Sequence, residues 1–145
     1  QDRLGHKRTT LSLLVVWIAT TCGLLLFTYN ETRAADSAAL PRWPIWLFGN
    51  FIGFGLGALG SANRAFVGYL TPTRRAGEFF GLWGLIFKFA ALLTIPFGAA
   101  KDAWGTPTAL AVLLAFLVIG FALTLFVDER RGLAAARAED ADPPA

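Results

Sequence analysis

Four long apolar runs dominate the chain, and short polar stretches separate them. The runs cover residues 11–29, 45–69, 79–100 and 107–127, and the first and last contain no charged residue. Each run is long enough to cross roughly 30 Å of hydrocarbon as a helix that rises about 1.5 Å per residue. A segment in lipid must pair its own backbone groups, which excludes open strands. The pattern therefore predicts an all-α polytopic membrane protein with four transmembrane helices rather than a soluble helical bundle.

The polar stretches are predicted to be loops on alternating sides of the membrane. Residues 1–10 form a cytoplasmic loop, 30–44 an extracellular loop, 70–78 a second cytoplasmic loop and 101–106 an extracellular turn. The last stretch, 128–145, is rich in Ala, Asp and Pro from Gly132 onwards. Such a composition is typical of disorder, so we expect a disordered cytoplasmic tail.

The distribution of positive charge predicts the orientation. The stretches before the first run, between the second and third, and after the fourth contain eight basic residues: Arg3, Lys7, Arg8, Arg74, Arg75, Arg130, Arg131 and Arg137. The other side has Arg33, Arg42 and Lys101. Because Lys and Arg accumulate in cytoplasmic loops, both ends of the segment are predicted to be cytoplasmic. We expect an integral protein of the bacterial inner (plasma) membrane.

The remaining composition restricts the function classes. No basic cluster with interleaved aromatic residues lies outside the apolar runs, so a nucleic-acid partner is not predicted. The chain has no phosphate-cradling glycine loop, no metal-ligand cluster and no nucleophile beside a base. We therefore expect neither an enzyme nor an ATP-driven pump, and no cofactor. The lipid bilayer is the predicted environment.

Lys88 is the exception within the third run. It lies ten residues beyond Glu78, about 15 Å along a helix and therefore close to the bilayer midplane. A lysine at that depth is unfavourable by about 2.5–3.5 kcal/mol on insertion scales. None of the four runs contains Asp, Glu or His. Lys88 is therefore predicted to bind an anionic substrate group or to take part in ion coupling, or else to pair structurally with an acid outside these helices.

The start of the chain resembles a loop motif of the major facilitator superfamily. The residues Asp2, Arg3, Gly5, Lys7 and Arg8 follow the pattern of the cytoplasmic loop that joins helices two and three, and again eight and nine, in that superfamily. Four predicted spans follow this motif. The resemblance implies that the chain is the C-terminal third of a twelve-helix transporter, helices nine to twelve, with eight further helices as partners.

A second resemblance narrows the family. A series of short motifs is similar to the pattern of one branch of the superfamily, which contains fungal vacuolar amino-acid effluxers linked to autophagy and many bacterial permeases. The motifs are Gly60 to Arg64, Pro72, Glu78 to Gly81, and Lys88 with Phe89. The resemblance covers residues 57–90 well. This sequence has Gly60 where the pattern has Gln, and Asn63 and Ala65 where it has Ser. The missing amide means that the substrate does not follow from the resemblance.

The resembling fold implies that the second and third spans line a central cavity. The hypotheses for this region place Asn50 in the cavity or in a bond to a neighbouring helix. Arg64 either anchors its helix at the interface or makes a cytoplasmic gate contact, with Glu78 or with the other half of the transporter. The loop residues Asp2, Arg3 and Gly5 join these cytoplasmic contacts.

Glycine and proline mark places of close packing or bending. Gly49, Gly53 and Gly57 are four residues apart in the second span, a spacing that allows helices to approach closely; they serve packing or bending. Pro96 removes a backbone hydrogen bond and should kink the third span toward its outer end. Thr94 is placed to compensate through its hydroxyl.

The predicted function is secondary active transport of a small solute, amino acids being one class, by alternating access. The alternative is a free-standing four-helix membrane scaffold or assembly protein. That alternative explains the hydropathy but gives no reason for a midplane Lys88.

Overall fold

Every regular element of the structure is a helix within the described part of the chain. A computed structural model describes residues 5–33, 41–92 and 94–141. The elements are α1 (His6–Arg33), α2 (Trp43–Leu70), the 3₁₀ turn η2 (Thr73–Arg75), α3 (Ala76–Leu92), α4 (Thr94–Trp104), α5 (Thr106–Phe126) and α6 (Glu129–Ala141). Four stretches are long and apolar enough to span a membrane: His6–Glu31, Trp43–Leu70, Thr73–Trp104 and Thr106–Phe126. The predicted all-α membrane class is confirmed.

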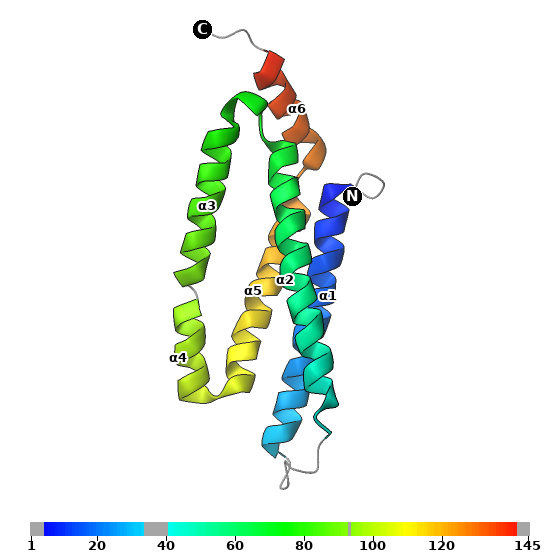
Figure 1. The fold of residues 1–145 in the computed structure, drawn as a ribbon, viewed down its shortest axis with the longest axis vertical. Coiled ribbons are helices and arrows are strands. Elements are labelled where there is room, and N and C mark those ends of the chain that lie inside the picture. Colours follow the sequence, from blue (N-terminus) through cyan, green and yellow to red (C-terminus); the bar gives the residue numbers. More distant parts are fainter. Residues whose placement is uncertain (1–4, 34–40, 93, 142–145) are drawn as a thin grey trace.

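The helices form two groups (Figure 1). Helices α1, α2 and α5 lie side by side, and α1 contacts both of the others. Helices α3 and α4 follow one another in a separate arm that joins α2 through the η2 turn at one end and packs against α5 through α4 at the other. Helix α6 lies at the end of the bundle where α1 begins.

The contact between α1 and α2 depends on two glycines. A Cβ atom at Gly55 would overlap the Trp17 indole, and one at Gly23 would lie 2.7 Å from Cε1 of Phe48. Each helix thus inserts a large aromatic side chain where the other has only a hydrogen. This exchange brings the two backbones close together, which is the usual way for small residues to strengthen helix contacts in membranes.

Most apolar side chains lie on the outside of the described chain. The exposed fraction is 70% for Phe89 and 86% for Phe126, and no residue of α3 is buried. Exposing many large side chains to water would be unfavourable by about 25 cal/mol per Å². The surface therefore suits hydrocarbon or further helices as its surroundings.

The third span consists of α3 and α4, and the kink expected from Pro96 stays a prediction because residue 93 lies outside the described residues. Helix α3 ends at Leu92 and α4 begins at Thr94, so Pro96 lies in the first turn of α4. Proline has no N–H for the carbonyl four residues earlier, and its ring collides with that carbonyl. The Thr94 hydroxyl donates a 2.6 Å hydrogen bond to the carbonyl of Ala91. This hydrogen bond is to the carbonyl just before the one that loses its partner, so the predicted compensation stays a prediction.

Two helices extend beyond the predicted apolar runs. Helix α1 begins at His6 and ends at Arg33, so it extends past the apolar run of 11–29 at both ends. Helix α4 continues to Trp104, which leaves Gly105, at φ 86°, as the turn before α5. Hydropathy marks only the part of a helix that lies in lipid, whereas backbone hydrogen bonding continues into the polar interface.

The expectation of a disordered tail was wrong for residues 129–141, which form α6. The Asp128 carboxylate accepts hydrogen bonds from the backbone N–H groups of Arg130 and Arg131, at 3.0 and 3.1 Å, and so caps the first turn. The helix is rich in alanine, the strongest helix former. Composition indicated disorder because α6 has little apolar surface, and its support comes from contacts with distant loops. Residues 142–145 lie outside the described residues.

Candidate functional site

Lys88 lies on α3, one turn before the helix ends at Leu92. Its side chain is exposed, and its neighbours Phe87 and Phe89 are exposed as well. Among the residues that the structure describes, no acidic side chain forms an ion pair with Lys88. Because an unpaired ammonium group is unfavourable in hydrocarbon, a binding or pairing role for Lys88 stays a prediction.

Arg64 contacts an aromatic ring on α3, and its predicted roles in anchoring or in a cytoplasmic gate stay open. Its guanidinium carbon lies 5.8 Å from the centre of the Trp83 ring, across the gap between α2 and α3. Within the described chain, Arg64 and Glu78 form no ion pair. The arrangement is a cation–π contact, and Trp83 stacks in turn on Phe87 at 5.6 Å. Arg64 thus connects the two spans that were predicted to line the cavity. Its partner Trp83 precedes Lys88 by five residues on α3.

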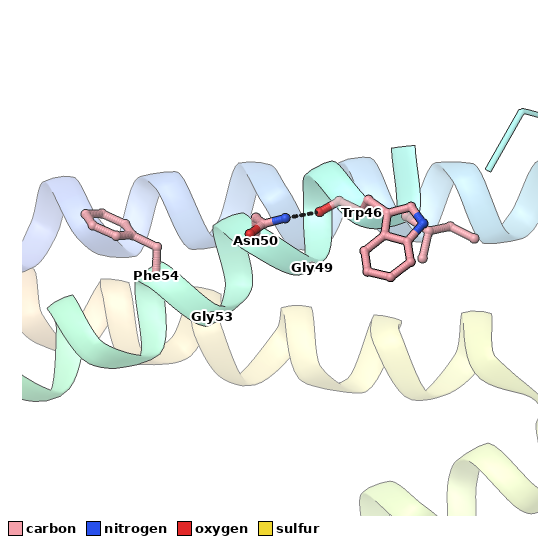
Figure 2. A pocket seen from close by; sticks show the side chains of 6 residues that line it. Trp46, Gly49, Asn50, Gly53 and Phe54 are labelled. Carbon is pink, nitrogen blue, oxygen red and sulfur yellow. Dashed lines mark hydrogen bonds between the residues drawn. The ribbon is translucent and has the colours of Figure 1, made fainter. Parts of the chain in front are cut away.

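Asn50 lies in a shallow groove along α2 (Figure 2). The groove is lined by Ile45, Trp46, Gly49, Asn50, Gly53 and Phe54. The Asn50 side-chain nitrogen donates a 2.8 Å hydrogen bond to the Trp46 carbonyl of the same helix. Asn50 therefore bonds to its own helix rather than to a neighbour. Its amide oxygen is available as an acceptor, and the two flanking aromatic rings bound the groove.

The glycine stripe of α2 has no neighbour in the described chain. A Cβ atom at Gly49, Gly53 or Gly57 would meet nothing within 4 Å. The close approach of α2 to α1 occurs instead on another face, at Gly55. The spacing of Gly49, Gly53 and Gly57 predicts a helix face of small residues, but it does not determine which face of α2 packs against α1. The role of the stripe in packing or bending stays a prediction.

The N-terminal loop residues lie at the end of the bundle that α6 covers. Gly5 has φ 80°, a left-handed conformation that favours glycine. The His6 N–H donates a 3.3 Å hydrogen bond to the Glu129 carboxylate, and the His6 ring lies 4.4 Å from the Tyr69 ring. The Lys7 ammonium group donates to the carbonyls of Leu125 and Val127, at 2.8 and 2.6 Å. Asp2 and Arg3 lie outside the described residues.

Sequence reasoning missed the acidic contacts of α6. The Asp140 carboxylate accepts hydrogen bonds from the Thr73 N–H and hydroxyl, both at 3.0 Å, and from the Arg74 N–H at 3.3 Å. The backbone hydrogen bond from Thr73 is the main reason that the pKa of Asp140 is lowered from its ordinary 3.8. Glu139 pairs with Arg75 at 3.4 Å. No local pattern could reveal these contacts, because more than sixty residues separate the partners.

Four apolar spans, one of which carries a lysine, define a polytopic α-helical membrane protein in the described part of the chain. The chain belongs to the family described as vacuole effluxers like Atg22, which matches residues 1–137. A relative from Bacillus subtilis (strain 168), the uncharacterized MFS-type transporter YxiO, is 28% identical over 130 residues, which are 88% of this chain. Both matches are to transport proteins. The resemblance to this branch of the major facilitator superfamily is confirmed, while the assignment to helices nine to twelve stays a prediction.

The chain spans 28% of the length of that relative. No solved structure matches the chain.

Proposed function

We propose that this chain is part of a secondary active transporter of the major facilitator type, which moves a small solute across the membrane by alternating access. The family match and the YxiO relative support the transporter class. The observation that carries the proposal is Lys88, an exposed cation within a span and without an acidic partner among the described residues. A central, hydrated binding site gives such a group a function, since transporters place their binding groups near the midplane.

The proposed substrate is a small solute with an anionic group, and amino acids are the first class to test. Lys88 would contact the anionic group. Asn50, whose amide oxygen is available in the groove of α2, would accept a hydrogen bond from the same solute. Both groups act by binding, so we propose no covalent step.

The proposal includes further helices that cover the open faces of α2 and α3. The relative YxiO is several times longer than the matched segment. Gly49, Gly53 and Gly57 offer a surface onto which another helix can pack closely, and no residue of α3 is buried. Eight preceding helices would enclose the cavity and complete the twelve-helix bundle.

We also propose that both ends of this segment are cytoplasmic, in a bacterial inner membrane. The start of α1, the η2 turn and α6 lie at one end of the bundle (Figure 1). These elements contain Arg8, Arg74, Arg75 and the arginines of α6. The opposite end has Arg33, Arg42 and Lys101. The excess of positive charge at the first end is that of a cytoplasmic side.

The test is transport of labelled solutes, amino acids first, in vesicles that contain the natural protein or its Lys88→Ala variant. We expect the variant to insert and fold but to lose at least about tenfold in transport, because a charge-assisted contact contributes about 1.5–3 kcal/mol. Lys101→Ala, which changes a lysine at the far end of the arm, should transport normally. Equal transport by the Lys88 and Lys101 variants would assign Lys88 a structural role. No transport of any solute would favour the membrane scaffold.

A further inference from the structure

The three acidic residues within α6 contact two segments that are distant in sequence, the start of α1 and the η2 turn. Glu129 accepts from the backbone of His6 at the start of α1. Glu139 pairs with Arg75, and Asp140 accepts from Thr73 and Arg74 in the η2 turn. Helix α6 therefore joins the first group of helices to the turn from which the α3–α4 arm begins.

Apolar contacts support this connection. Ala136 is 6% exposed and Pro72 is buried, where α6 lies over the end of α2. A Cβ atom at Gly132 would lie 3.0 Å from Cδ2 of Leu70, so the α6 backbone approaches this side chain closely. Helix α6 is thus seated on the turn by packing as well as by hydrogen bonds.

Asp140 acts on the first backbone N–H groups of the segment that continues into α3. These N–H groups have no carbonyl partner within their own helix, so an external carboxylate satisfies them and interacts favourably with the positive end of the helix dipole. The same carboxylate receives the Thr73 hydroxyl. The orientation of the α2–α3 turn therefore depends on a residue almost seventy positions later in the chain.

We propose that α6 is a strap that holds the α2–α3 turn against the α1–α5 end of the bundle, and that it must release this turn before α3 can move relative to the other spans. Asp140 is its positioning residue. The strap goes beyond the proposed transport function, and only its effect on transport rests on that function. The Asp140 carboxylate accepts hydrogen bonds from the Thr73 and Arg74 N–H groups, so the strap is closed in the state described.

Hydrogen exchange of the natural protein in lipid nanodiscs tests the contact directly. Asp140→Ala should accelerate exchange in peptides that cover residues 71–80 by about 3- to 10-fold, which corresponds to one typical backbone hydrogen bond. Arg137→Ala, on the same helix, should leave these peptides unchanged. Peptides from the α1–α2 contact should keep their protection in both variants. Equal exchange of residues 71–80 in both variants would overturn the proposal.

A reversible cross-link tests whether the strap must open. It also provides a second test of the strap if the Asp140→Ala variant does not fold. The variant combines Thr73→Cys and Asp140→Cys with Cys22→Ser, and the control pairs Thr73→Cys with Arg137→Cys. Oxidation of the first pair should form a disulfide and slow exchange throughout residues 76–92, and a reductant should reverse both effects. No disulfide, or unchanged exchange in α3, would refute the strap even if the protein moves no solute. Where transport is measurable, oxidation should stop it.

Discussion

Single residues decide how closely α1 and α2 approach. Gly55 and Gly23 leave room for Trp17 and Phe48, whereas the glycines of the predicted stripe meet nothing within 4 Å. Gly55 and the glycines of the stripe all lie on α2, and only their neighbours differ. The energetic weight of a glycine in this protein therefore depends on the helix face on which it lies.

Gly55→Ala is predicted to be destabilising. The new methyl group would overlap the Trp17 indole, and overpacking of this kind typically lowers the free energy of unfolding by about 1–3 kcal/mol. Thermal unfolding of the purified protein in detergent would measure the effect. Gly84→Ala is the matched control, because a Cβ atom there meets nothing within 4 Å and alanine is the better helix former. An unchanged midpoint for Gly55→Ala would show that Trp17 can move aside freely.

Helix termini in this protein are completed by other elements. Asp128 caps α6 from within its own segment, whereas Asp140 caps the η2–α3 segment from α6. At the end of α5, the Lys7 ammonium group of α1 reaches two carbonyls that have no intrahelical partner. Positive charge at this position also interacts favourably with the negative end of the helix dipole. The helix ends therefore link segments that lie far apart in the chain.

Lys7→Met is predicted to weaken the end of α5. The variant keeps the length of the side chain but removes the charge and both hydrogen bonds, which contribute about 1 kcal/mol at a partly exposed helix end. Chemical denaturation followed by tryptophan fluorescence would measure the loss. Arg8→Met serves as the control, because Arg8 is an exposed neighbour with no contact to these carbonyls. Equal losses in the two variants would attribute the effect to general charge rather than to capping.

At the scale of the whole molecule, the described chain is an open assembly. Helix α1 contacts both α2 and α5, the α3–α4 arm stands apart along much of its length, and many aromatic side chains are exposed (Figure 1). A membrane solvates such surfaces, and further helices would cover those next to Lys88 and the glycine stripe. The proposed twelve-helix transporter supplies these helices.

Gly53→Leu tests this coverage in the natural protein. If a further helix packs on the stripe, the larger side chain should separate the two helices and lower the unfolding midpoint by several degrees, as about 1–3 kcal/mol of overpacking would. Gly120→Leu on α5, which is not one of the spans predicted to line the cavity, should have little effect. Thermal unfolding of both variants provides the comparison. The same midpoint in both would mean that the stripe faces lipid.

Much of the architecture follows from the sequence because it depends on local properties. An apolar run of membrane length must be helical and must lie in lipid, wherever the rest of the chain lies. Pro96 removes one backbone hydrogen bond wherever it stands in a helix, because the missing N–H is a property of that residue. The family resemblance likewise followed from short motifs, and the match over residues 1–137 confirmed it.

The tertiary structure decided everything that depends on neighbours distant in sequence. Hydropathy could not distinguish Gly55 from Gly53, because the difference lies in which face meets Trp17. Arg64 contacts Trp83 rather than Glu78, since the relative rotation of α2 and α3 sets which side chains meet. Helix α6 was mistaken for a disordered tail because it has little apolar surface of its own. Its order comes from carboxylates that find backbone donors in the η2 turn, which only folding brings within reach.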